Sequence, residues 1–475
     1  MMFQVTRPSS PPRRKLAPST LALLAVVSGC TSLDPKPDID RAAATVAERA
    51  GIAPAWTEPW EASLTAWDGR APLKIEQALA MALRNNREIR AEVEQIAASR
   101  ADLVQAGLLP NPVLGLALRF PFDPVSGGTF IGAQVVQSFT ALWLRGGRIK
   151  AADARLNQTV LDISDKALRL VAEVKTTHTR IAFGQRAVAL AEENLATVQK
   201  TIGSLEARVR GGEGTPLDVN RARQQHAKAQ ADRAILIRDL ARDRRRMLEL
   251  IGFAGANAEW TAEPGTSISE GSLIDEAASI SLAESQRLDV AAARSMALAQ
   301  QADLSVEERS RLKDFGVGAN FERDIDGKKN IGPVVEIAVP IFDTNAAQIA
   351  KAGSLARAAF ANSEAVSQRA VREARVAWVE LDSASRLVEQ YRSTVLDISE
   401  RNLTLAEAAL KGGQPDVTVL LEAQREVIDA RARLNDLERQ AAIARIELEY
   451  AVGGRLVMPC GPPAPPSPEN PGTTP

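Results

Sequence analysis

Apolar side chains recur every seven residues through a long central stretch of the chain. A second row, beginning at Ile163, follows three residues behind the first. The first row is Val160, Ala167, Val174, Ile181, Val188, Leu195, Ile202 and Val209. Such a seam predicts one helix that packs against its neighbours as helices do in a coiled coil. Running from Gly146 to Arg210, this helix would be on the order of 100 Å long.

The same pattern returns about 200 residues later. Its two rows are Ala374, Leu381, Val388 and Val395, and Ala377, Ala384, Tyr391, Ile398 and Leu405. Each seam ends at a pair of glycines, after which the helical pattern resumes. We therefore predict two helical hairpins, at about 146–251 and 345–452, with Asn345 as the N-cap of the second.

Four other stretches alternate strictly between apolar and small or polar residues, as strands with two different faces do. They lie at about 113–120, 131–142, 314–323 and 333–342. Each has roughly ten residues, the length that a tilted membrane strand requires. The alternative is a four-stranded sheet of a water-soluble protein.

The chain is duplicated at a spacing of 201 residues. The segment from Gly211 to Gly252 aligns without a gap on the segment from Gly412 to Gly453. The fold class predicted is mainly α with a small β part, in two pseudo-repeats at 73–252 and 253–453. Each repeat supplies helices, a strand pair and a long helical hairpin.

The N-terminus has the features of a lipoprotein signal peptide over residues 1–29. A basic segment at Arg13 precedes a short apolar run that ends in Val27-Ser28-Gly29-Cys30. This ending resembles a bacterial lipobox, which implies that cleavage leaves Cys30 as the acylated first residue. A plain signal peptide is the alternative. Residues 30–72 are expected to form an acylated extended arm, and residues 454–475 a Pro-rich disordered tail that contains Cys460.

Composition excludes several classes of protein. The net charge is −1, which gives no reason to expect nucleic acid as a partner. Two cysteines cannot form a disulfide framework. The two histidines, His178 and His226, have no partner at ligand spacing and are expected on the surface or in a seam. We predict no enzyme activity, no cofactor and no metal site.

Four strands are too few to close a barrel, and an open sheet edge in lipid leaves backbone N–H and C=O groups unpaired. Several copies must therefore share one barrel if these strands lie in a membrane. Three copies would supply twelve strands, which is wide enough for a channel. The hairpins would extend that barrel as a helical tube.

The order helix, strand pair and long hairpin, repeated twice, resembles the TolC-like outer membrane factor family. Pro340-Ile-Phe-Asp-Thr-Asn345 resembles that family's Pro-Leu-Phe-Asp-Gly-Gly motif, and Leu144-Arg-Gly-Gly-Arg148 is its counterpart in the first repeat. Val417-Thr-Val-Leu-Leu-Glu-Ala-Gln424 resembles the family's returning helix. The resemblance covers about residues 73–453. It departs from the pattern at Ala141, where the family usually has Pro.

This resemblance implies a homotrimer in the outer membrane of a Gram-negative bacterium, with a shared transmembrane β-barrel and a periplasmic tunnel. The partners implied are a periplasmic adaptor, an inner-membrane efflux pump and outer membrane lipid. The function implied is the passive exit duct of a tripartite efflux system. Two alternatives are a coiled-coil lipoprotein that scaffolds the periplasm and the outer membrane duct of a type I secretion system.

The ends of the two hairpins are the candidate functional sites. The glycines Gly211, Gly212, Gly412 and Gly413 permit tight reversal and are adaptor-contact candidates. The candidates for a charged periplasmic gate are Glu213, Asp218, Asp416, Arg208, Arg210 and Lys411. A ring of carboxylates would favour cations. The alternative for Asp218 and Asp416 is ordinary capping in the first turn of a helix.

Overall fold

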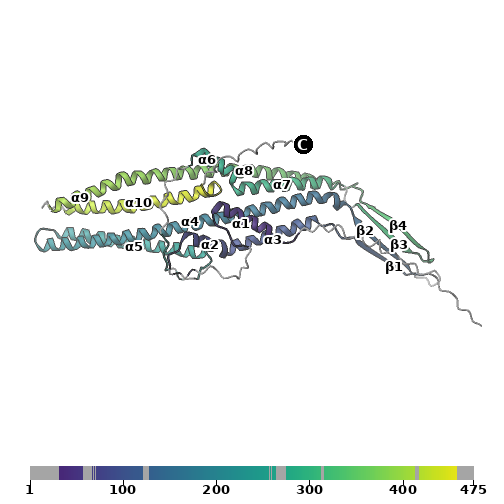
Figure 1. Ribbon diagram of the computed structural model, residues 1–475, viewed down its shortest axis with the longest axis horizontal. Coiled ribbons are helices and arrows are strands. Elements are labelled where there is room, and N and C mark those ends of the chain that lie inside the picture. The colour runs from purple at the N-terminus through teal and green to yellow at the C-terminus, as the bar shows by residue number, and fades with distance from the viewer. Residues whose placement is uncertain are drawn as a thin grey trace, which may run out of the picture.

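The computed structural model describes residues 32–56, 67, 69, 71–120, 128–255, 257, 259–263, 274–311, 315–411 and 417–456. These form a long rod with a small sheet at one end and the ends of two helical hairpins at the other (Figure 1). The first repeat contains α2 (Ile75–Asn85), α3 (Arg87–Gly107), β1 (Val113–Arg119), β2 (Phe130–Ser138), α4 (Thr140–Arg210) and α5 (Pro216–Leu250). The second contains α6 (Glu276–Gln286), α7 (Leu288–Arg309), β3 (Phe315–Arg323), β4 (Lys329–Ile337), α8 (Ala346–Gln390), the π-helix η3 (Tyr391–Leu396), α9 (Asp397–Lys411) and α10 (Val417–Ala451).

Helix α4 is longer than the heptad pattern predicted. It has 71 residues and begins at Thr140, so the second strand ends at Ser138 and not near residue 142. Phe139 and Thr140 still bond to β3: Phe139 N donates to Phe315 O (2.7 Å), and Phe315 N donates to the Thr140 hydroxyl (2.7 Å). Gly147 lies inside the helix because α7 packs closely there; a Cβ at this position would be 2.5 Å from Val306 Cγ2. Tertiary packing thus outweighs the low helix propensity of glycine.

Two helices, and not one continuous helix, precede the strands in each repeat. Asn86 separates the first pair, and its side chain accepts hydrogen bonds from the N–H groups of Glu88 and Ile89. Arg287 holds the corresponding position between α6 and α7. The breaks let short α2 and α6 turn across the long helices while α3 and α7 run along them (Figure 1).

The seam of the second hairpin was predicted wrongly beyond Tyr391. Ile398 and Leu405, assigned to the seam, are 50% and 68% exposed, whereas Ser399 and Ala406 are each 7% exposed. The π-helix η3 causes this change, because its extra residue rotates every later position of the hairpin. A simple count of seven cannot detect such an insertion.

The segment predicted as an extended arm contains a helix, α1 (Lys36–Ala50), which packs on α4. Ala42, Val46 and Ala50 are buried at intervals of four, the helical spacing that the Pro- and Trp-rich flanks obscured. The end of α1 also contacts the second repeat. Arg49 donates to Gly453 O (2.7 Å), and Arg455 N donates to Arg49 O (3.1 Å). Residues 454–456 therefore belong to the folded body, although they were predicted to begin the disordered tail.

Asn345 is the N-cap residue of α8, as predicted, but its side chain does not cap that helix. It takes the left-handed conformation (φ 63°), and its amide donates to Glu307 O (2.9 Å) and to the Ser310 hydroxyl (2.8 Å) at the end of α7. The side chain thus links the end of α7 to the start of α8 through Glu307 O and the Ser310 hydroxyl.

His178 is buried on α4, and its Nε2 lies 2.9 Å from Leu73 O. Burial lowers the pKa of His178. Leu73 pairs with Ala262 in a short parallel bridge, and Ala262 is held in turn by both ends of the Gln185 amide. The histidine therefore fastens the loops before α2 and after α5 to α4.

The sheet has the order β1-β2-β3-β4, and all three pairs are antiparallel. The strands of the two repeats meet at the β2–β3 pair. Among the described residues, β1 and β4 each pair on one side only, so both edges of the sheet are open. The predicted fourth strand ended near residue 342, but β4 ends at Ile337.

Candidate functional site: an amphipathic sheet, a hairpin end and an inter-repeat joint

The two faces of the sheet differ in chemistry. Cross-strand partners share a face, so the row Leu116, Ala133, Phe321 and Ile331 crosses all four strands on one side. This side also carries Leu114, Leu118, Ile131, Val135, Val317, Val335 and Ile337. It is open in the single chain: Leu116 is 73% and Ile331 80% exposed. A continuous apolar surface of this kind suits lipid or a second protein surface.

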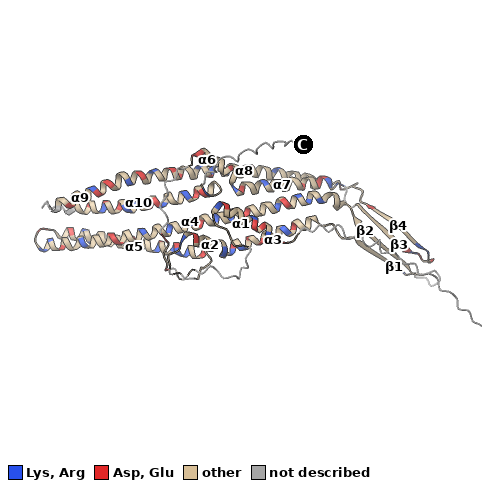
Figure 2. Cartoon of the chain, viewed as in Figure 1, with Lys and Arg blue, Asp and Glu red and all other residues tan. Residues whose placement is uncertain are grey.

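The opposite face is mostly small and polar. It carries Gly115, Ala117, Gly132, Gln134, Gly316, Gly318, Asn320, Glu322, Asn330, Gly332 and Glu336, together with the apolar residues Val113, Phe130, Val136 and Val334. Charged side chains occur on the strands only near their ends (Figure 2). Lipid on one side and water on the other is the arrangement that a channel wall requires.

The first hairpin reverses at Gly211 and Gly212. Gly212 takes φ 80°, a left-handed conformation that favours glycine, whereas Gly211 is right-handed. Helix α5 then begins with a capping box. Asp218 Oδ2 accepts from the Thr215 hydroxyl (2.6 Å) and from Thr215 N (3.3 Å), and these bonds lower the pKa of Asp218. The carboxylate of Asp218 therefore caps its own helix.

The structure describes only some of the remaining gate candidates. Glu213 and Arg210 are exposed at the end of the first hairpin, and Arg208 is half-buried. Within the part of the chain that the structure describes, neither Arg208 nor Arg210 forms an ion pair. Gly412, Gly413 and Asp416 lie outside the described residues, as does Cys30, and the side chain of Lys411 is not described.

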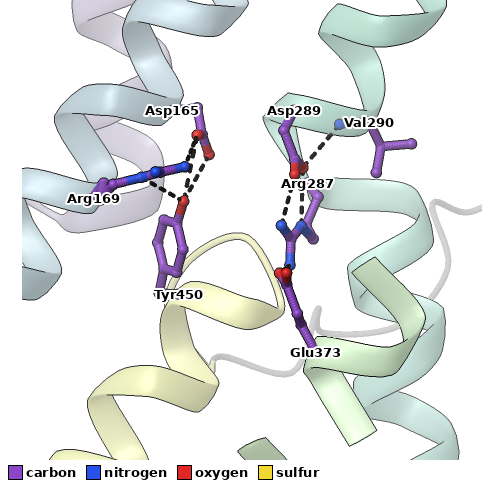
Figure 3. Close-up of polar contacts among 7 residues, drawn as sticks. All are labelled: Asp165, Arg169, Arg287, Asp289, Val290, Glu373 and Tyr450. Carbon is purple, nitrogen blue, oxygen red and sulfur yellow. Dashed lines mark hydrogen bonds and ion pairs between the residues drawn. The ribbon is translucent and has the colours of Figure 1, made fainter. Parts of the chain in front are cut away.

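A polar cluster joins the two repeats near the middle of the rod (Figure 3). On α4, Arg169 donates to the Tyr450 hydroxyl of α10 (3.2 Å) and to Asp165 Oδ2 (3.3 Å). Tyr450 donates a longer bond to Asp165 (3.4 Å). Burial raises the pKa of Asp165, and nearby Asp289 raises it further. Burial, with Asp165 alongside, raises the pKa of Tyr450 to about 12.

The other half of the cluster is built on Arg287, between α6 and α7. Its side chain is 6% exposed and donates to both carboxylate oxygens of Asp289 (2.9 and 2.6 Å) and to Glu373 Oε2 of α8 (2.6 Å). These bonds raise the pKa of Arg287 although burial opposes them. The guanidinium is thus fixed as a cation that links α7 to α8.

Sequence analysis did not single out any of these six residues. Tyr450 lies 285 residues from Asp165, and Arg287 lies 86 from Glu373, so no local spacing connects them. Only the packing of α10 and α7 on α4 brings them together. Among the described residues there is no group of three or more His, Cys, Asp or Glu arranged to hold a metal ion. No helix in the described part of the chain is both long and apolar enough to cross a membrane.

A rod of roughly 100 Å with an open amphipathic sheet at one end defines one subunit of a membrane duct. Comparison with known proteins identifies the kind of duct. The model of the outer membrane efflux protein family matches residues 78–252 and 279–454, that is, both repeats, and the chain belongs to this family.

A curated relative is the cobalt-zinc-cadmium resistance protein CzcC of Cupriavidus metallidurans. It is 25% identical over 394 residues, which cover 81% of this chain and 91% of the relative. Solved structures share the fold. The channel protein CusC has a TM-score of 0.68 at 17% identity, covering 85% of this chain and 98% of the other. The outer-membrane channel OprN has a TM-score of 0.68 at 18% identity, covering 86% and 96%.

The chain is therefore an outer membrane channel of the efflux type, the exit duct of a tripartite system, with its helices forming a periplasmic tunnel. The family consists of channels and not of enzymes. Its members are trimers that work with an adaptor and an inner-membrane pump. The resemblance predicted from the motifs is confirmed, and so are the fold class and the outer membrane location.

Proposed function

We propose that three copies of this chain form one channel, in which each copy contributes four strands to a shared barrel and two hairpins to a common tunnel. The open edges of the sheet carry this proposal. Among the described residues, β1 and β4 each leave one edge unpaired, beside a face that is apolar except for Gln137, Arg323 and Lys329 near the strand ends. In lipid these groups need partners, and the edges of identical copies supply them without any further protein.

The direct test is the mass and shape of the protein purified in mild detergent. Light scattering is expected to give a trimer, and negative-stain microscopy a barrel continued by a tube of roughly 100 Å. A monomer, or a slender rod without a barrel, would place the strands in water and favour the periplasmic scaffold.

The acyl chains of a lipoprotein would anchor this channel through Cys30. The lipobox-like sequence Val27-Ser28-Gly29-Cys30 supports this anchor, and α1 follows within a few residues and packs on α4. Cys30→Ser is expected to abolish acylation, detected as the loss of the lipid mass on the N-terminal peptide. Trimers are expected to persist, because the sheet and hairpins form the subunit contacts.

The cargo proposed is divalent transition-metal cations. Its support is the similarity to CzcC, which covers 81% of this chain and 91% of CzcC. A strain that lacks the gene is expected to lose resistance to cobalt, zinc or cadmium and to keep its resistance to organic drugs. The opposite pattern of susceptibility would point to drug efflux. Unchanged resistance to both, with polypeptide accumulating in the periplasm, would point to type I secretion.

The hairpin ends are proposed as the adaptor contact and the closed gate. Asp218→Ala together with Asp416→Ala is expected to raise single-channel conductance in planar bilayers if carboxylates close the pore. Because Asp218 also caps α5, Thr215→Val is the matched control: it removes the cap and keeps both charges. Equal conductance changes in the control and the double variant would assign Asp218 to capping alone.

A further inference from the structure

The two hairpins differ by one residue at a defined place. Along α4 and α8, buried positions correspond at a spacing of 200: Val174 with Ala374, and Ile181 with Leu381. Beyond η3 the spacing becomes 201, as for Leu205 with Ala406. The second hairpin therefore carries one extra residue between Leu381 and Ala406. The π-helix at Tyr391–Leu396 is where the helix accommodates it.

This extra residue gives η3 and α9 two apolar stripes. The stripe that faces the seam contains Leu396, Ser399, Leu403 and Ala406, of which Ser399 and Ala406 are buried. The other stripe lies one residue earlier and contains Val395, Ile398 and Leu405, with Ile398 and Leu405 largely exposed. Within the single chain, the seam thus buries a serine and an alanine and leaves an isoleucine and a leucine exposed.

The exposed stripe would reproduce the seam of the first hairpin. At a spacing of 200, Ile398 corresponds to Val198 and Leu405 to Leu205, and both of these α4 residues are buried. A continuous α-helix through residues 391–396 would bring Ile398 and Leu405 into the seam. Moving α9 by one residue rotates it by about 100° and shifts it by about 1.5 Å.

Charged contacts hold α9 in the register observed. Arg431 of α10 donates to Glu400 of α9 (2.9 Å) and also pairs with Glu193 of α4 (3.5 Å). Glu438 of α10 pairs with Arg392 of η3 (2.7 Å) and with Arg186 of α4 (2.7 Å). All of these side chains except that of Glu438 are well exposed, so each contact is weak enough to exchange.

We propose that η3 is a register joint: α9 exchanges between the observed seating and a second one, in which the π-helix is removed and Ile398 and Leu405 enter the seam. This exchange rotates the outer surface of α9. The helix lies near the end of the tunnel that is opposite the sheet (Figure 1). The exchange provides a conformational change in the second hairpin that the first, with its continuous α4, does not have.

The test follows the reaction of introduced thiols with a membrane-impermeant maleimide on the full-length trimer in detergent, read by mass spectrometry on the labelled peptide. In the chain of natural length, the thiol of Ile398→Cys is expected to react fast and that of Ser399→Cys slowly. Deletion of Ser393 removes the extra residue and is expected to reverse this order. Ser393→Ala, which keeps the length, is the matched control and should leave the order unchanged.

A second measurement applies even if the deletion variant does not fold. The Ser399→Cys thiol is exposed, and reacts, only in the second register. Burial of Ile398 and Leu405 stabilises that register. Replacing both by Ser removes this hydrophobic stabilisation and should slow the reaction about tenfold. An unchanged rate overturns the proposal. So does protection of the Ile398→Cys thiol in the trimer, which would show that the exposed stripe is a contact between subunits.

Discussion

Replacing Arg287 by Ala tests the ion-pair link between α7 and α8 in the second repeat. The change leaves Asp289 and Glu373 without their shared cation at the start of α7 (Figure 3). Removing one partner of a fully buried ion pair costs about 3–5 kcal/mol. Here the carboxylates are 26% and 39% exposed and water compensates them in part, so we expect a loss of about 2 kcal/mol.

The assay is amide hydrogen exchange of the trimer in detergent, because local opening can be measured without two-state unfolding. A loss of about 2 kcal/mol corresponds to roughly 30-fold faster exchange in the first turns of α7. The matched control is Arg386→Ala on α8, which removes an exposed pair with Asp382 (2.9 Å) and should change exchange less than about threefold.

A second substitution is expected to rescue the Arg287→Ala variant in part. Glu373→Gln in the Arg287→Ala background removes one of the uncompensated carboxylates and is expected to restore part of the protection. If amide exchange in Arg287→Ala matches that in the Arg386→Ala control, Arg287 does not hold α7 to α8. Loss of protection spread over the whole chain would show a general folding defect and not a local one.

Three further variants test the packing around the rod. Gly147→Ala should lower thermal stability by about 1–3 kcal/mol, because its Cβ meets Val306, whereas Gly146→Ala, which meets no atom within 4 Å, should be neutral or stabilising. Burial lowers the pKa of His178, so the unfolded chain takes up a proton at this residue before the folded chain does, and folding stability should fall as pH drops below about 6.5. His178→Gln should remove this contribution to the pH dependence of the melting temperature, measured between pH 5 and 8. Asn345→Ala should destabilise the α7–α8 junction by about 1–3 kcal/mol, through its lost hydrogen bonds and its positive φ, and Asn345→Gly should recover the part due to φ, both read from exchange at the start of α8.

Periodic patterns in the sequence were enough to predict most of the architecture. Heptads identified the long helices, alternation identified the four strands, and the 201-residue duplication identified the two repeats. These signals are reliable because helix and strand periodicity is a property of neighbours along the chain. The unpaired sheet edges then followed from counting strands, and the family followed from local motifs.

Tertiary structure decided whatever depends on residues far apart in sequence. The need for glycine at position 147 follows from contact with Val306 of α7, and the role of Asn345 follows from the end of α7 lying beside it. The cluster around Asp165 and Arg287 exists only because α7 and α10 pack on α4 while α8 packs on α7 and α10. In α9, two apolar stripes one residue apart compete for a single seam, and their periodicity alone cannot choose between them. The π-helix makes that choice, because the position of one extra residue within a helix is set by packing against its neighbours.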